Sequence, residues 1–216
     1  MGIVRRLTEK PWLAPGLDPL AEAEAQGPRL PATAVGLRVY FGVATVMFLL
    51  IAAMFVMRMG EHGVSADQQP DWKPMYWPPL LWFNTGVLIL NSAAWEWARA
   101  AGRRGQMEGL RTGLVVAGVL ALGFLAGQLI VWRQLEDAGC GITATTMSAF
   151  FYLITALHGL HLVGGLTVWG RATAKVMGGG EAAEVQESVD LCTIYWHFLL
   201  LVWLLMFGLL LLTQTG

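Results

Sequence analysis

The sequence predicts an all-α membrane protein, a polytopic bundle of five transmembrane helices with a cytoplasmic N-terminus. Hydrophobic residues make up 56% of the 216 residues and charged residues 13%, against about 25% charged residues in an ordinary soluble domain. Five mostly apolar segments have the ~20 residues that a helix needs to cross a hydrocarbon core of ~30 Å. Lys and Arg gather in alternate connections between these segments, as expected for a chain that crosses the bilayer repeatedly.

The chain divides into an N-terminal tail and a membrane domain. Residues 1–32 contain Pro, Glu, Arg and Ala without the unbroken apolar core of a secretory signal, so we expect a retained tail on the cytoplasmic surface. Residues 33–216 form the transmembrane domain. Its five predicted spans are residues 33–57, 78–98, 113–132, 147–169 and 191–212.

The distribution of positive charge sets the predicted orientation. Eleven of the fourteen Lys and Arg residues fall in the tail and the second and fourth connections, and only Arg58, Lys73 and Arg133 fall on the other side. Because cytoplasmic segments carry the excess of Lys and Arg, the N-terminus is predicted inside. A formal net charge of −1 without a basic run excludes a nucleic-acid partner.

Several tryptophans mark the predicted ends of the spans. Trp95, Trp132 and Trp169 all fall near such ends, where the amphipathic indole settles at the depth of the lipid headgroups. We therefore expect them to act as interfacial anchors. The second span begins with "WPPLLWF", and prolines suit a helix entrance because its first N–H groups have no partner within the helix.

Polar residues in the second and third spans predict helix packing. Asn84 and Asn91 lie seven apart, on one helix face, and amides do not titrate, which favours packing over a proton path. In "GFLAGQLIVW", Gly123 and Gly127 form a small-xxx-small pattern beside Gln128, which predicts close helix contact. Glu96 precedes Arg99 by three positions, and we expect an ion pair at the cytoplasmic interface.

Three of the four histidines fall within predicted spans. His158 and His161 share one side of the fourth helix, and His197 of the fifth lies at a depth close to that of His161. Two interpretations are open: a metal or haem site, because neutral imidazole ligates both, or hydrogen bonding between helices. No charged residue lies at mid-depth in any predicted span, which argues against a pump, an ion channel or a charge-coupled transporter.

Four stretches together resemble a known family. "WFNTGVLILNSAAWEWA", "GFLAGQLIVW", "FYLITALHGLHLVGGL" and "YWHFLLLVWLLMF" are similar, in this order, to subunit III of the haem-copper terminal oxidases, in its short five-helix bacterial form. The resemblance covers residues 78–212. It implies a subunit without redox cofactor, metal site or catalytic residue, which packs beside subunit I and supports dioxygen reduction and proton translocation there. The haems and copper are then expected in subunits I and II.

The resemblance also assigns roles to particular residues. It implies a structural polar network between helices, whose members are His158, His161, His197, Gln128, Asn84 and Trp196. The chain departs from the family pattern at two places, because Thr45 and Leu200 stand where many members carry carboxylates. The histidines are then expected to be uncharged, to lie between helices and to bond neutral acceptors such as threonine hydroxyls or backbone carbonyls.

The resemblance implies a part in the aerobic respiratory chain of a bacterial cell (inner or plasma) membrane. The expected partners are oxidase subunits I and II, membrane lipids, and cytochrome c or a quinol as electron donor to the complex. Two alternatives stay open at this point. One is the accessory subunit of a nitric oxide reductase system, and the other is a small membrane cytochrome that ligates haem through His158 or His161 and His197.

Overall fold

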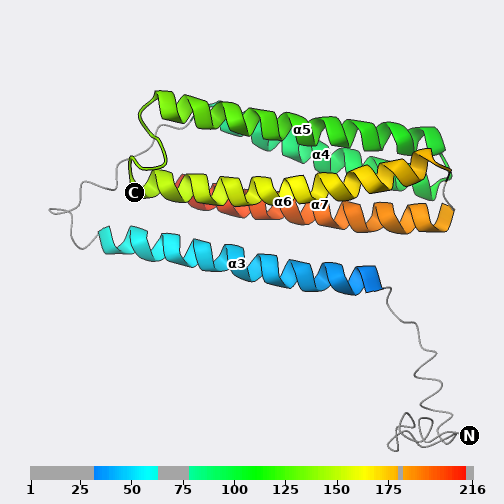
Figure 1. The fold of residues 1–216 in the computed structure, drawn as a ribbon, viewed down its shortest axis with the longest axis horizontal. Helices are drawn as coiled ribbons and strands as arrows, with labels where there is room; N and C mark the ends of the chain where they lie inside the picture. Colours follow the sequence, from blue (N-terminus) through cyan, green and yellow to red (C-terminus); the bar gives the residue numbers. More distant parts are fainter. Residues whose placement is uncertain (1–31, 63–77, 180–181, 213–216) are drawn as a thin grey trace, which may run out of the picture. The chain divides into compact units, whose positions relative to one another are not determined.

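The computed structural model describes residues 32–62, 78–179 and 182–212, and within these ranges the secondary structure is helical (Figure 1). The helices are α3 (Ala32–His62), α4 (Leu80–Arg103), α5 (Met107–Asp137), α6 (Thr146–Met177) and α7 (Ala182–Leu212). The described residues from Leu37 onward belong to one compact unit. The predicted tail, apart from residue 32, and the connection 63–77 lie outside the described residues.

The all-helical prediction is confirmed, with one predicted span on each described helix. Four helices are long and apolar enough to cross a membrane: Thr33–Arg58 of α3, Met107–Asp137 of α5, Thr146–Met177 of α6 and Val185–Leu212 of α7. The fifth, α4, carries the amides and hydroxyls of Asn84, Asn91 and Ser92 in its middle, and these interrupt its apolar sequence.

Most of the helices extend beyond the predicted spans, because a helix does not stop where hydrocarbon ends. α7, for example, begins at Ala182, nine residues before its predicted span. The ends carry ordinary helix signals. Thr145 caps α6 through a capping box with Ser148, whose backbone N–H donates to Thr145 Oγ1 at 3.0 Å. Gly105 and Gly139 follow the last residues of α4 and α5 at φ 71° and 77°, a conformation in which glycine avoids a steric cost.

Four helices form a closed ring. α4 packs on α5 and α7, and α6 packs on α5 and α7, so the four share one interior. Large side chains fill it, and Trp95, Phe124, Phe151 and Trp203 are all at most 2% exposed. Of the polar side chains that the sequence singles out, this ring holds Asn84, Asn91, Gln128 and His158.

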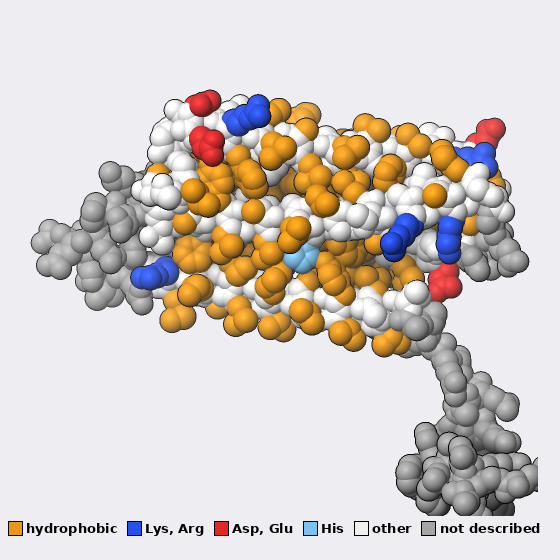
Figure 2. Space-filling model, viewed as in Figure 1, with side chains coloured by type: hydrophobic (Ala, Val, Ile, Leu, Met, Phe, Trp, Pro, Cys, Tyr) orange, Lys and Arg blue, Asp and Glu red, His pale blue; other side chains and the backbone are white. Residues whose placement is uncertain are grey.

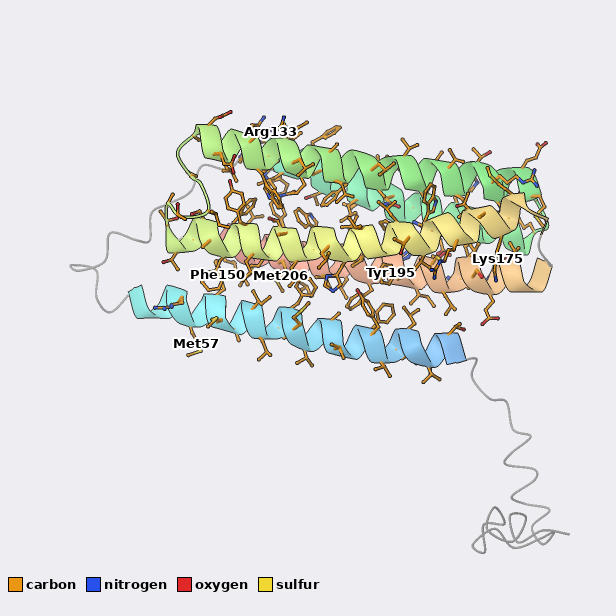
Figure 3. All side chains as sticks on the ribbon, in the orientation of Figure 1. Met57, Arg133, Phe150, Lys175, Tyr195 and Met206 are labelled. Atoms are coloured by element: carbon orange, nitrogen blue, oxygen red, sulfur yellow. The ribbon has the colours of Figure 1, made fainter. Side chains whose placement is uncertain are left out.

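The helix α3 is attached to the ring through long side chains (Figure 3). Phe41 stacks on Phe198 of α7 with ring centroids 4.5 Å apart. Tyr195, labelled on α7 in Figure 3, meets Tyr40 of α3, and the two hydroxyl oxygens lie 3.2 Å apart. The Tyr195 hydroxyl also donates to the carbonyl oxygen of His161 at 2.8 Å. A hydroxyl pair and several aromatic contacts therefore link α3 to α6 and α7.

Close contact between helices occurs at some glycines and not at others. A Cβ on Gly127 would overlap the amide of Asn84, and one on Gly118 would overlap the indole of Trp169. At Gly123 nothing lies within 4 Å of such a Cβ. The predicted close contact is thus found at Gly127, and the prediction for Gly123 is wrong because this residue lies on the exposed face of α5.

Charge is confined to the ends of the helices. Figure 2 shows Lys, Arg, Asp and Glu near the two ends of the described helices, with hydrophobic side chains covering the surface between them. Arg133 and Met57 lie at one end and Lys175 at the other (Figure 3). This distribution suits a protein whose middle is surrounded by lipid.

Gly118 and Gly123 of α5 differ in surroundings, so replacing each with alanine should distinguish the effect of packing on stability from the effect of helix propensity. We expect Gly118→Ala to destabilise the purified chain by about 1–3 kcal/mol, because the new methyl group overlaps Trp169 in a filled interior. Thermal unfolding in detergent measures the effect. Gly123→Ala is the matched control and should be neutral or stabilising by up to about 1 kcal/mol. Equal loss in both variants would contradict this account of the contact.

A double-mutant cycle should measure the link between α3 and α7. We expect Tyr40→Phe and Tyr195→Phe each to lower the thermal stability of the chain, with a coupling of about 0.5–1.5 kcal/mol from the shared hydroxyl pair. Tyr195→Phe should cost more alone, since its hydroxyl also bonds the His161 carbonyl. If the two costs simply add, the hydroxyls do not bond each other.

Candidate functional site

The interior of the ring contains polar side chains from all four helices. The buried polar side chains of the described residues are Asn84, Thr85, Asn91, Ser92, Gln128, Ser148, Thr155, His158 and Thr193. No Asp, Glu, Lys or Arg is among them in this part of the chain. The interior of the described ring is therefore polar in places but contains no carboxylate, ammonium or guanidinium group.

His158 is the most enclosed of the three histidines. It is 1% exposed and lies between Phe124 of α5 and Trp203 of α7, with ring centroids 5.8 and 5.1 Å away. Within the described residues neither of its ring nitrogens has a hydrogen-bond partner. His158 thus connects three helices by packing, and its two nitrogens face the interior unpaired.

The other two histidines bond their own helices. His161 Nδ1 donates to the Leu157 carbonyl and His197 Nδ1 to the Thr193 carbonyl, both at 2.7 Å. Because a carbonyl only accepts, Nδ1 carries a proton in each ring. These acceptors are the backbone carbonyls that were expected, although they lie on the same helix as the imidazole and not on a neighbour.

The surroundings of these two rings differ. His161 lies against Tyr40 and Phe48 of α3, with ring centroids 5.9 and 5.4 Å away. His197 is exposed on α7 and bonds only its own helix, so the expectation that it lies between helices is wrong within the described chain. Among the described residues there is no group of three His, Cys, Asp or Glu side chains that could hold a metal ion. The structure therefore does not bring the three histidines together at one point.

The remaining members of the expected network are buried. Asn84 is 1%, Trp196 2% and Gln128 3% exposed. Asn84 lies against Gly127, the residue before Gln128, and Trp196 stacks on Trp95 with ring centroids 5.9 Å apart. Asn84 Nδ2 and both amide atoms of Gln128 have no partner among the described residues.

Hydrogen bonds between the helices come from indoles and hydroxyls that are not among the six expected members of the polar network. Trp203 Nε1 of α7 donates to Thr85 Oγ1 of α4 at 3.0 Å, and Trp132 Nε1 of α5 to Thr155 Oγ1 of α6 at 3.1 Å. Trp169 Nε1 of α6 donates to the Leu114 carbonyl of α5 at 2.8 Å. The interpretation of Trp132 and Trp169 as anchors alone is wrong, because their N–H groups bond neighbouring helices.

Trp95 also differs from the expected interfacial anchor. Its side chain is 0% exposed within the ring, whereas Trp97, two positions further along α4, is 49% exposed. The helical period turns Trp95 inward and Trp97 outward. Both tryptophans lie near the predicted end of the second span, so their position in the sequence does not show which one is buried.

The places of the two family carboxylates are occupied by residues in different settings. Thr45 is exposed on α3, while its neighbour Ala44 is 3% exposed and faces the ring. Leu200 is partly buried and packs against the main apolar core. Neither side chain titrates in the physiological range, so no proton is held at these two places.

An ionic cluster joins α4 to α7 at one end of the ring. Arg99 Nε donates to Asp190 Oδ1 at 2.9 Å, and Arg103 Nη2 donates to Asp190 Oδ2 at 3.1 Å. The expected pair of Arg99 with Glu96 is present at 3.6 Å, and Gln186 Nε2 also donates to Asp190. Sequence reasoning missed Asp190, since it lies on another helix, far along the chain.

Neutralising the acidic centre of this cluster should loosen the contact between α4 and α7. We expect Asp190→Asn to destabilise the chain by about 1 kcal/mol, because the groups are partly exposed and water screens them. Thermal unfolding at low and high salt measures it, and the loss should shrink at high salt. Asp137→Asn, at the exposed end of α5, is the control and should have little effect. A loss that is equal in both variants would contradict the ionic interpretation.

The comparisons with known proteins agree with one another. The family model described as cytochrome c oxidase subunit III matches residues 18–212, a wider range than the resemblance of residues 78–212 because it includes α3. A protein of Mycobacterium tuberculosis named probable cytochrome c oxidase subunit 3 is 31% identical over 174 residues, which cover 76% of this chain and 84% of the relative.

Two further relatives extend the comparison. Cytochrome c oxidase subunit 3 of a Synechocystis species is 29% identical over 173 residues, covering 77% of this chain and 72% of the relative. Cytochrome bo(3) ubiquinol oxidase subunit 3 of Pseudomonas aeruginosa is 22% identical over 175 residues, covering 81% and 82%. With the apolar helices, these matches do not favour the nitric oxide reductase or cytochrome alternatives. The chain belongs to the cytochrome c oxidase subunit III family and is a subunit III of a haem-copper oxidase.

Proposed function

We propose that this chain is a cofactor-free supporting subunit, in which helix packing and not redox chemistry is the contribution to the oxidase. One observation carries this proposal: the buried polar side chains of the described ring are amides, hydroxyls and one imidazole, without a buried charge. A redox or proton-transfer centre in a membrane interior relies on metal ligands or titratable groups. Asn84, Gln128, Trp196 and the three histidines would then serve structure.

The topology that we propose has five spans, with α4 as the fifth. At ~1.5 Å per residue, the 24 residues of α4 exceed the ~30 Å hydrocarbon core. Its polar side chains are buried against α5 and α7 and so need not meet lipid. Residues 33–216 would form this domain and residues 1–32 a surface tail.

The proposed orientation places the N-terminus in the cytoplasm of a bacterial cell, with the chain in its plasma membrane. Cationic residues at one end of the described helices support this orientation, and they are more numerous than Arg58 and Arg133 at the other end. They are Arg38, Arg99, Arg103, Arg104, Arg111, Arg171 and Lys175.

The proposed partners are the haem- and copper-bearing subunits I and II. Cytochrome c is the donor that we favour for the complex, because the relatives at 31% and 29% identity are named cytochrome c oxidase subunits. The relative named for a ubiquinol oxidase is 22% identical. Membrane lipids would cover the apolar surface between the charged ends.

Purification through a tag on this chain tests the proposal. We expect haem- and copper-containing subunits to co-purify, and the complex to oxidise reduced cytochrome c faster than ubiquinol. The haem spectrum per complex should be unchanged in His158→Ala, His161→Ala and His197→Ala, because the proposed role of these residues is structural.

Two results would contradict the proposal. A Soret band that stays with the isolated chain and disappears in a histidine variant would show a haem in this subunit. A partner that reduces nitric oxide and holds no copper would show a different complex. His62→Ala is the matched control, since His62 lies at the end of α3.

A further inference from the structure

Three unpaired polar side chains lie in one layer of the ring. Asn84 of α4, Gln128 of α5 and His158 of α6 are 1%, 3% and 1% exposed. Five of their polar atoms are without a hydrogen-bond partner among the described residues: Asn84 Nδ2, Gln128 Nε2, Gln128 Oε1, His158 Nδ1 and His158 Nε2. In a protein interior such groups are nearly always paired with protein or with water.

The contacts place these groups at the same level. Asn84 lies against Gly127, which adjoins Gln128. Phe124, one helical turn from Gln128, contacts the His158 ring, and on the other side of Gln128 Trp132 bonds Thr155, three residues before His158. Gln128 therefore lies on the stretch of α5 between two contacts with α6.

Two threonine hydroxyls that border these side chains are already occupied. Thr155 Oγ1 accepts from Trp132 and donates to the Phe151 carbonyl. Thr85 Oγ1 accepts from Trp203 and donates to the Leu81 carbonyl. The threonine hydroxyls that border the layer thus have partners for their protons. Asn91, Ser92 and Trp95 of α4 also carry unpaired atoms, but they lie about two to three helical turns from Asn84.

Direct bonds among the three side chains satisfy them only in part. The structure shows no bond among them, and even if the Gln128 amide accepted from Asn84 Nδ2 and donated to one imidazole nitrogen, one ring nitrogen would be left. The second imidazole nitrogen is on the other side of the ring and stays unpaired. A neutral imidazole needs both a donor and an acceptor beside it, and one amide end cannot reach both positions.

We infer that Asn84, Gln128 and His158 form an internal binding site for ordered water within the ring. Water both donates and accepts, so it completes the mixed set of amide and imidazole atoms. A cation does not fit, because no carboxylate is among the buried side chains of the described helices. This water site goes beyond the proposed supporting role, and it does not depend on which electron donor serves the complex.

A density map of the purified wild-type oxidase, at a resolution that shows ordered water, tests the inference. We expect water density at about 2.7–3.2 Å from the Gln128 amide and from a His158 ring nitrogen. A map that shows the Gln128 amide bonded directly to His158, with no density beside either side chain, would overturn the site.

Radiolytic footprinting of the same complex gives a second measurement. Hydroxyl radicals formed from bound water oxidise neighbouring side chains, so Trp203 should be modified although it is 2% exposed. Phe48, also 2% exposed but packed in an apolar cluster, is the internal reference. Modification of Trp203 that is no faster than that of Phe48 would count against bound water.

Variants sharpen the result. We expect Gln128→Met, which keeps the length of the side chain, to remove the water density and to slow Trp203 oxidation several-fold. Gln134→Met, at an exposed position of the same helix, should leave both unchanged. If Gln128→Met fails to assemble, the wild-type map and footprint still decide. Unchanged oxidation in an assembled Gln128→Met complex would overturn the site.

Discussion

The high cost of an unpaired polar group in hydrocarbon governs this structure. The backbone meets it by forming helices, and two buried threonine hydroxyls meet it by bonding twice. Thr85 and Thr155 each donate to a carbonyl of their own helix and accept from a tryptophan of a neighbour. Each hydroxyl therefore donates its proton within its own helix, while its oxygen accepts a hydrogen bond from a neighbouring helix. These bonds tie α4 to α7 and α5 to α6 without any charge.

The same constraint explains which features could be predicted from the sequence. Asn84 and Asn91 recur every seven residues, and such a period fixes the inward face of α4. It does not fix how the neighbouring helix is rotated. The bond from Trp203 to Thr85 and the ion pair from Asp190 to Arg99 join residues that are 118 and 91 positions apart. No local pattern specifies such pairs, and a tryptophan near a span end has the same signature whether it faces lipid or a helix.

The histidines show how a motif separates into different environments once it is folded. His158 and His161 are three residues apart, yet one faces Phe124 and Trp203 inside the ring and the other faces Tyr40 and Phe48 of α3. A shared stripe on a helix spans ~100° or more, enough to meet two neighbours. The contacts place His158 and His161 at two different interfaces, while His197 is exposed on α7.

The attachment of α3 has a consequence for biogenesis. Its contacts are to α6 and α7, the last helices to be synthesised, among them the pair of Tyr40 with Tyr195. The nascent α3 must therefore remain in the bilayer as an independently stable helix until the C-terminal third of the chain has been inserted. A chain truncated before α7 lacks both Tyr195 and Phe198, so its α3 keeps only the ring contacts with α6, such as that of Phe48 with His161.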